Sequence, residues 1–352
     1  MKVEFQSLYI KNIVKETDDC VSVEFDVPES IRQNFAYKAG QYLTFKKMID
    51  GAEIRRSYSL CSAPHENIWK VAIKQVYQGK FSSFANKDLK VGDVLEVMKP
   101  SGNFILKEDF QNKNFALFAA GSGITPVISL AKTMLNQGHG SVTLIYGNKG
   151  FNEIIFREEL ESLKNMYMNR FRIIHVFSRE SLGNSLQKGR IDDKKTSLMY
   201  DAFLKLENIH EVYSCGPESM ILGINKALID KGFDEKNIHF ELFGTSTQKK
   251  EEELVVRDEL AAKVEVVLDN DSTAFDLNSN GVSILDAAQK FGADLPFACK
   301  GGVCCTCKAK VLEGKVEMDI NYALTPEEVS QGYVLTCQSH PISKFVKISF
   351  DD

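Results

Sequence analysis

Alternating apolar and polar residues predict strands throughout the first part of the chain. Period-two segments lie at residues 22–27, 41–45, 69–76 and 94–97, and turns rich in Gly, Pro and charged residues separate them. The first ten residues, MKVEFQSLYI, alternate in the same way. Short strands at this spacing are typical of a small antiparallel β-barrel, which we assign to residues 1–108.

From Asn114 onward the pattern changes to apolar strands that alternate with helices. A continuous apolar strand at 115–120 runs into a Gly-rich turn and then a helix that ends near Gly138. Further strands are expected at 142–146, 172–177 and 211–214, with helices at 153–165 and 218–231. This alternation predicts a doubly wound α/β domain with a parallel sheet, over residues 109–244.

A third domain follows a charged connection. Residues 245–258, TSTQKKEEELVVRD, are strongly polar, and we expect an exposed linker over 245–262. Strands at 263–268 and 273–277, and a helix at 283–290 capped by Ser283, then open a C-terminal domain over 263–352. The predicted fold class is therefore a multidomain α+β protein.

Charge and hydropathy narrow the possible functions. The net charge of −5 resides in residues 263–352, which hold 8 Lys and Arg against 13 Asp and Glu, whereas the rest of the chain is balanced at 35 against 35. This distribution argues against a general polyanion binder, so no nucleic-acid partner is expected. The sequence lacks a bilayer-length apolar run and a signal-peptide core, so we expect a cytoplasmic protein without a membrane partner.

Four cysteines near the C-terminus have the spacing of a plant-type 2Fe–2S cluster. They are Cys299, Cys304, Cys307 and Cys337. Gly301 and Gly302 allow the loop backbone to approach the cluster sulfides closely. Cys305 does not fit the spacing. Structural zinc stays open as an alternative, although zinc sites usually use two C-x₂-C pairs and only one is present here.

Arg56-Ser57-Tyr58-Ser59 lies at the end of an expected barrel strand and offers three groups that a flavin requires. These are a cation for a diphosphate, an aromatic face for a flat ring and a hydroxyl donor for the polar ring edge. A second segment, Gly79-Lys-Phe-Ser82-Ser, follows a strand and opens a helical turn. Its N–H groups and Ser82 are suited to binding a pyrophosphate.

A dinucleotide site is indicated by two segments that follow strands. Gly121-Ser-Gly123-Ile-Thr125-Pro126 joins a strand to a helix, so its glycines let phosphates approach a helix N-terminus. Pro126 stands where the common G-x-G-x-x-G pattern has its third glycine. The partner segment is Cys215-Gly216-Pro217, and a buried structural thiol is the alternative for Cys215.

NADPH is favoured over NADH as the dinucleotide. The strand at 142–146 leads into Gly-Asn148, with no acidic residue for a ribose 2′-hydroxyl. Ser178 and Arg179 follow the next strand and could hold a 2′-phosphate. An exposed arginine without this role is the alternative.

In these motifs and their order, residues 1–243 resemble the ferredoxin–NADP reductase superfamily, and about 90 C-terminal residues resemble the ferredoxin module, which has a β-grasp fold. The resemblance implies FAD as the flavin and the four cysteines as cluster ligands. It places Tyr58, Ser59 and Cys215 at the reacting rings as the catalytic set, with Thr125 beside the nicotinamide. The implied cofactor-binding residues are Arg56, Ser57, Tyr58, Ser59, Lys74, Val76, Gly79, Lys80, Ser82, Gly121, Gly123, Thr125, Pro126, Ser178, Arg179, Cys215, Gly216 and Pro217. For Lys74, a solvated strand face is the alternative.

A flavin between the other two sites would convert hydride, which carries two electrons, into the single electrons that a cluster accepts. The expected path is NADPH to FAD to the 2Fe–2S cluster to an oxygenase component. Segments such as 297–304 and 332–337 resemble reductase components of phenylacetyl-CoA epoxidases, and Cys305 departs from that pattern. One alternative is a reductase that serves another oxygenase or a desaturase. The other is a binding protein that senses redox state.

Overall fold

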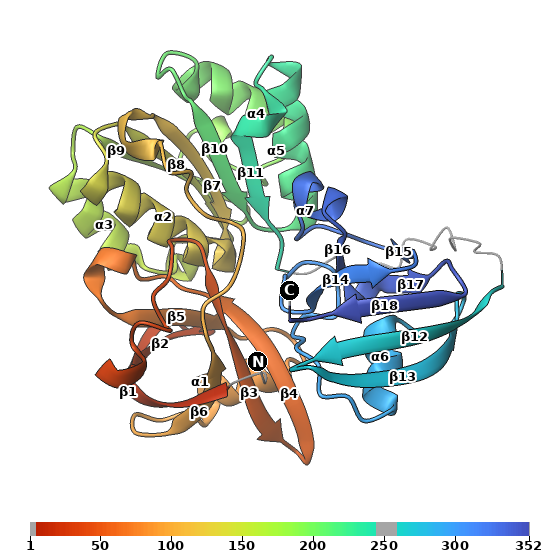
Figure 1. The fold of residues 1–352 in the computed structure, drawn as a ribbon. Coiled ribbons are helices and arrows are strands. Elements are labelled where there is room, and N and C mark those ends of the chain that lie inside the picture. The colour runs from red at the N-terminus through yellow and green to blue at the C-terminus, as the bar shows by residue number, and fades with distance from the viewer. Residues whose placement is uncertain (1–4, 244–258, 352) are drawn as a thin grey trace.

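Three main sheets, each with its own hydrophobic core, make up the computed structural model, which describes residues 5–243 and 259–351 (Figure 1). Residues 245–258 of the predicted linker lie outside the described residues. None of the helices in the described part of the chain combines the length and apolarity needed to span a bilayer.

The N-terminal sheet is antiparallel, in the order β4-β3-β6-β1-β2-β5. Its strands are β1 (Phe5–Thr17), β2 (Cys20–Asp26), β3 (Tyr42–Ile49), β4 (Ala52–Ser59), β5 (Trp69–Lys74) and β6 (Val94–Met98). A bridge between Leu60 and Val71 joins the two outer strands and closes the sheet. Large apolar residues such as Phe25 and Phe45 fill the interior, and helix α1 (Lys80–Lys87) covers one end. The predicted barrel is confirmed.

The second sheet is parallel, in the order β11-β10-β7-β8-β9. Its strands are β7 (Phe115–Ala120), β8 (Val142–Asn148), β9 (Phe171–Phe177), β10 (Glu211–Cys215) and β11 (Ile238–Glu241), and its helices are α2 (Ile124–Gln137), α3 (Arg157–Met166), α4 (Asp193–Met199) and α5 (Glu218–Asp230). Phe115 and Leu117 pack toward α2, whereas Ala116 and Phe118 pack toward α5. Because helices cover both faces, these strands are continuously apolar.

Three elements of this domain differ from the prediction. The helix expected at 153–165 begins only at Arg157. The chain turns at the buried Phe156, whose backbone is left-handed (φ 61°), before the helix starts. Helix α4 and strand β11 were not predicted, because each is short and only tertiary packing distinguishes it from a loop.

The C-terminal domain has a mixed sheet in the order β13-β12-β18-β14-β16, with a small sheet of β15 and β17 beside it. Its elements are β12 (Ala261–Leu268), β13 (Asp271–Asn278), α6 (Ile284–Lys290), β14 (Lys308–Glu313), β15 (Val316–Met318), α7 (Pro326–Ser330), β16 (Tyr333–Leu335), β17 (Ser339–Pro341) and β18 (Phe345–Ser349). The Ser283 Oγ accepts from the Asp286 N–H at 3.2 Å, as the predicted helix cap requires. The predicted β-grasp class is confirmed.

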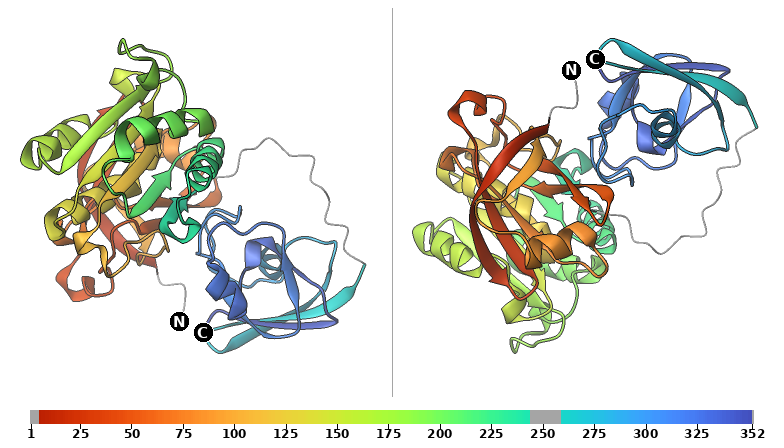
Figure 2. Two further views of the ribbon diagram at one scale, coloured as in Figure 1. Left: turned by 90° about the horizontal axis from the view of Figure 1, so that it is seen from above. Right: turned by 90° about the horizontal axis from the view of Figure 1, so that it is seen from below.

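Strand β12 begins two residues earlier than expected. Ala261 and Ala262, which the sequence analysis assigned to the linker, pair with Asn278 and Leu277. Ala262 is buried, so pairing and burial together extend the strand beyond its recognisably alternating part. Figure 2 shows this C-terminal domain, in blue, packed beside the other two.

The barrel and the α/β domain are joined by a buried charge network. Lys132 of α2 is 4% exposed, and its Nζ contacts the Cys61 carbonyl, Glu66 of the barrel and Glu159 of α3. Lys70 of the barrel also binds Glu159, at 3.2 Å. Each charge is therefore compensated by partners from the neighbouring domain.

We expect Lys132→Met to destabilise the protein by about 3 kcal/mol, because it leaves two carboxylates at the interface without their shared cation. Lys15→Met is the matched control, since the ion pair of Lys15 with Asp18 is exposed on both sides, and it should cost less than about 1 kcal/mol. Calorimetric unfolding checks both. Equal melting temperatures for the two variants would contradict the role of the network.

Candidate functional site

The carboxyl ends of β7 and β10 form the topological switch point of the parallel sheet, where ligands bind in such folds. The Gly121–Gly123 turn follows β7, and Gly216 and Pro217 follow β10. A Cβ on Gly123 would lie 2.1 Å from the Cys215 carbonyl oxygen. Glycine is thus required at position 123 for the two loops to meet. Both loops line a cavity at this edge of the sheet.

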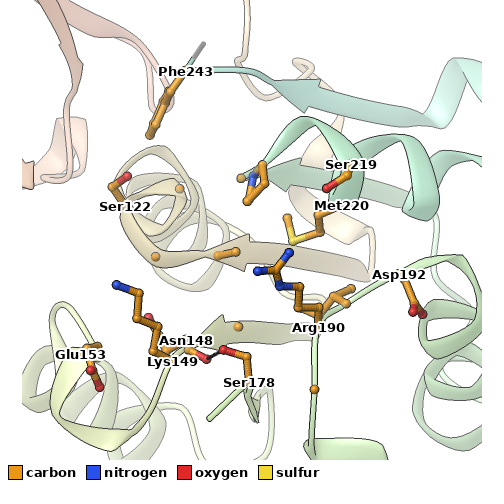
Figure 3. Close-up of a pocket in the computed structure, with 18 of the residues that line it drawn as sticks. Ser122, Asn148, Lys149, Glu153, Ser178, Arg190, Asp192, Ser219, Met220 and Phe243 are labelled. Carbon is orange, nitrogen blue, oxygen red and sulfur yellow. Dashed lines mark hydrogen bonds between the residues drawn. The ribbon is translucent and has the colours of Figure 1, made fainter. Parts of the chain in front are cut away.

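This first cavity has a volume of about 660 Å³, which suits part of a dinucleotide. The predicted residues that line it are Lys74, Gly121, Gly123, Ser178, Gly216 and Pro217. Figure 3 shows Lys149 and Arg190 extending into it from separate loops. Glu153 and Asp192 also line the cavity, and the two cations beside them can bind a phosphate-bearing ligand at the ends of the parallel strands.

Some predicted nucleotide residues do not line this cavity. Cys215 is fully buried behind Gly123, and Pro126 is buried in the first turn of α2. Arg179 is absent from the lining of both cavities in the described chain. Arg190, which sequence reasoning missed, does line the first cavity and brings a guanidinium to it. This residue lies in the loop between β9 and α4, the same loop that begins with Ser178 and Arg179.

A second cavity, of about 260 Å³, adjoins the first at the barrel. The predicted flavin residues Arg56, Ser57, Tyr58, Ser59, Lys74, Val76, Gly79, Lys80 and Ser82 all line it, together with Thr125. Lys74, Ser122 and Phe243 line both cavities. Ligands in the two cavities can therefore approach each other directly.

Local structure explains the shape of the second cavity. The Ser82 hydroxyl donates to the Gly79 carbonyl and accepts from the Val76 N–H, both at 3.2 Å, so it organises the turn before α1. A Cβ on Gly79 would lie 2.4 Å from that hydroxyl. Tyr58 lies on strand β4. The centroids of its ring and the Phe81 ring are 5.7 Å apart, and the two rings form an aromatic wall. The turn and the wall fit the phosphate and the flat ring of a flavin.

Glu241, at the end of β11, is the main polar residue of the site that the sequence analysis missed. The Ser59 Oγ, on the wall of the second cavity, donates to the Glu241 Oε2 at 3.2 Å. Burial raises the pKa of Glu241 to about 8, against a smaller opposing effect of this hydrogen bond. A protonated carboxyl behind a wall hydroxyl can exchange a proton with a group in the cavity.

The four predicted cluster cysteines converge in the third domain. Cys304 donates to Cys299 with the sulfurs 3.1 Å apart, and the Gly301 N–H donates to the Cys299 sulfur at 3.3 Å. Hydrogen bonds from Cys304 and Cys337 lower the pKa of Cys299, and a hydrogen bond from Cys337 lowers the pKa of Cys307. The same hydrogen bonds raise the pKa of Cys304 and Cys337, so without iron two of the four sulfurs act as anions and the other two as donors to them.

The loop has the backbone that a cluster needs. Gly302 adopts a left-handed conformation (φ 71°), and a Cβ there would lie 2.9 Å from the Ile320 carbonyl oxygen. Within residues 5–243 and 259–351, no three His, Cys, Asp or Glu side chains are grouped to hold a single metal ion. Cys305 points elsewhere, with its thiol 3.5 Å from the Ala323 carbonyl oxygen.

The cysteine loop lies directly against the barrel. The Cys305 N–H donates to the Tyr42 hydroxyl at 3.1 Å, and Tyr42 packs against Cys304 and Ala298. Tyr42 is paired across the β3–β4 hairpin with Ser59. The second cavity and the cysteine loop therefore border the same pair of strands.

Family models match all three parts of the chain. A family model described as an oxidoreductase FAD-binding domain matches residues 7–105, an oxidoreductase NAD-binding domain matches 117–226, and a 2Fe-2S iron-sulfur cluster binding domain matches 267–341. These matches confirm FAD, a nicotinamide dinucleotide and a 2Fe–2S cluster as cofactors, and they decide against the zinc alternative.

Full-length relatives share all three parts. The chain is 39% identical over 99% of its length to a component of the 1,2-phenylacetyl-CoA epoxidase of Escherichia coli K12, and it covers 98% of that component. It is 34% identical over 97% of its length to the ferredoxin reductase component of 3-ketosteroid-9-alpha-monooxygenase of Rhodococcus rhodochrous, of which it covers 96%. The structure of phthalate dioxygenase reductase has the same fold, with a TM-score of 0.61, 24% identity and 98% of each chain covered.

Replacing the neighbouring cysteines 304 and 305 tests the choice of cluster ligands. Cys304→Ala should abolish the visible absorbance of the cluster and lower the iron content, because it removes a ligand. Cys305→Ala should leave both unchanged, since that thiol faces Ala323. Absorbance and iron analysis of the purified variants check this. Loss of the cluster in Cys305→Ala with retention in Cys304→Ala would contradict the assignment.

The raised pKa of the partly buried Glu241 predicts a pH dependence of stability. Because its folded pKa of about 8 exceeds its unfolded value of 4.5, the folded state binds the extra proton between these values. The free energy of unfolding should therefore fall as pH rises through this window. Glu241→Gln should match the wild type near pH 5 and exceed its stability near pH 9 by about 1 kcal/mol or more. Parallel curves of melting temperature against pH for the two proteins would refute the shift.

Proposed function

The chain belongs to the family of oxygenase reductase components that join FAD-binding, NAD-binding and 2Fe–2S domains, and on that premise we propose that it passes electrons from NADPH through FAD and its own cluster to an oxygenase component. We assign the FAD-binding domain to residues 1–108, the dinucleotide domain to 109–244 and the cluster domain to 263–352.

One observation carries the proposal: the two cavities share walls, and the strand pair behind them touches the cysteine loop. Lys74, Ser122 and Phe243 border both cavities, so a nicotinamide and a flavin can meet there. Tyr42, paired with the cavity residue Ser59, contacts the loop of Cys304. When bound, the flavin would take hydride from the nicotinamide and release electrons singly to the cluster.

The residues of the chain bind, orient and shield. Arg56 and Lys80 supply positive charge for the FAD phosphates, and Tyr58 supplies a flat apolar wall for the ring. Ser59, hydrogen-bonded to Glu241, is placed to hold or move a proton at the ring edge. Cys215, buried behind Gly123, fixes the floor on which the nicotinamide rests.

The choice of NADPH rests on the residues around the first cavity. Ser178 lines it, Lys149 and Arg190 bring two cations, and Asn148 stands where an acidic ribose ligand would lie in an NADH site. We propose Ser178 and Arg190 as 2′-phosphate ligands, with Arg179 held beside them by its backbone hydrogen bond to the Lys149 carbonyl.

For the acceptor, we propose the oxygenase of a phenylacetyl-CoA epoxidase. Support comes from the 39% identity to a component of that epoxidase over nearly the whole of both chains. A second candidate is a monooxygenase such as the ketosteroid enzyme, favoured by the 34% identical reductase component. We place the protein in the cytoplasm, because the free thiols of Cys20, Cys61 and Cys215 suit a reducing compartment.

Reconstitution with purified oxygenase components tests the function and the acceptor. The proposal expects NADPH oxidation that depends on both the oxygenase and phenylacetyl-CoA. Activity only with a different oxygenase would reject the acceptor and keep the reductase. No electron transfer to any protein or artificial one-electron acceptor would reject the enzyme and favour a redox-sensing role.

Steady-state kinetics with an artificial acceptor tests the dinucleotide preference. We expect a higher kcat/KM for NADPH than for NADH. Arg190→Ala should lower kcat/KM for NADPH by about 10- to 100-fold and leave that for NADH nearly unchanged, since only the 2′-phosphate loses a charged partner. Arg179→Ala should have the smaller effect. An unchanged NADPH-to-NADH ratio in Arg190→Ala would overturn this assignment.

A further inference from the structure

The buried arginine Arg55 binds the third domain beside the cluster loop. It is 4% exposed, although it belongs to a barrel strand, β4. Its Nη2 donates to the Asp294 carboxylate at 2.8 Å, and its Nη1 donates to the Leu295 carbonyl at 3.2 Å. Its guanidinium carbon lies 4.5 Å from the centre of the Phe297 ring. All three partners lie in the segment that leads into Cys299.

Tyr42 of the adjacent strand β3 binds the other flank of the same loop. Its hydroxyl accepts from the Cys305 N–H at 3.1 Å and lies 3.3 Å from the Thr306 hydroxyl. The two barrel residues thus hold the cysteine loop from both sides. Tyr42 is also paired with Ser59, on the wall of the second cavity.

We propose that Arg55 is a positioning residue that latches the cluster loop onto the β3–β4 hairpin, so that one electron can pass from the flavin to a cluster iron. The proposal rests on the function proposed above. In this step the flavin is oxidised by one electron and a ferric iron of the cluster is reduced to ferrous. Each hydride received by the flavin supplies two such transfers.

We call the contacts of Arg55 with Asp294 and Leu295 the latch. The charges of these groups favour Arg55 as its main element. The guanidinium Nε donates to Glu53 of the same strand at 2.8 Å, which orients the side chain toward the third domain. Its two outward N–H groups then meet one charged and one carbonyl oxygen, a geometry that lysine cannot reproduce. The contact of Asn103 with Glu328 is exposed and contributes less. A partly buried hydrogen bond from Tyr322 to Glu218, at 3.1 Å, joins the third domain to the α/β domain instead of the barrel.

Two latch variants and one control separate docking from folding. Arg55→Gln and Asp294→Asn remove the ion pair from opposite sides, and Asp294 is exposed enough that its change should not disturb folding. Lys46→Gln is the control, because Lys46 lies directly opposite Arg55 on β3 but pairs with Glu96 within the barrel. All are studied as full-length holoprotein.

Stopped-flow reduction by NADPH should show unchanged flavin bleaching in both latch variants. Cluster reduction should slow by about ten-fold in Arg55→Gln, because the docked population falls when charge-assisted bonds are lost. Asp294→Asn should slow it less, and Lys46→Gln not at all. Hydrogen–deuterium exchange should rise in segments 42–49 and 294–306 of the latch variants only.

Unchanged cluster reduction and unchanged exchange in Arg55→Gln would overturn the latch. Slower flavin bleaching in the same proportion as cluster reduction would also overturn it, since that outcome indicates a general structural defect. If the wild type transfers no electrons from NADPH, the proposed function fails, and the exchange data still decide whether Arg55 holds the domains together.

Discussion

The pairing of β3 with β4 is the feature on which the arrangement of sites depends. Antiparallel pairing puts Tyr42 opposite Ser59 and Lys46 opposite Arg55. One end of the β3–β4 hairpin therefore borders the second cavity. Tyr42 and Arg55, on the same hairpin, contact the cysteine loop and the segment that leads into it. Electrons pass efficiently only between groups that are held close together, so this hairpin brings the barrel and the third domain into the relation that electron transfer requires.

The parallel sheet adds the dinucleotide site to the same junction. Its switch point lies between β7 and β10. Strand β11, the other neighbour of β10, ends at Glu241, whose carboxylate accepts a hydrogen bond from Ser59 of the barrel. A hydrogen bond between domains thus connects the wall of one cavity to the sheet that forms the other. The buried Lys132 network provides a second connection between these two domains, through α2 and α3.

Local motifs made much of this predictable. The spacing of Cys299, Cys304 and Cys307 within one loop, and the turn at Gly79, carry their geometry in a few neighbouring residues. Four strands of the α/β domain could be read from apolar runs because both faces of the sheet are covered. The fold class follows from the same local signals, and FAD as the flavin follows from the family resemblance that the motifs carry.

Residues defined by tertiary contact were not predictable in this way. Glu241 ends a four-residue strand that has no recognisable pattern, and only folding places it against Ser59. Arg190 lies in a loop that returns to the cavity after β9, whereas the motif-based choice, Arg179, does not line it. In the sequence Arg55 is one of two adjacent cations in an expected strand, and only the folded chain places its buried side chain against Asp294 and Leu295.

The central claim is that one chain takes electrons from NADPH and delivers them singly to its own iron–sulfur cluster. An anaerobic titration of the purified holoprotein with NADPH, followed by absorbance and EPR, tests it most directly. The account predicts loss of flavin absorbance together with the EPR signal of a reduced 2Fe–2S cluster, complete at about one and a half NADPH per chain, since the flavin takes two electrons and the cluster one. A flavin that bleaches while the cluster stays oxidised and EPR-silent would contradict it.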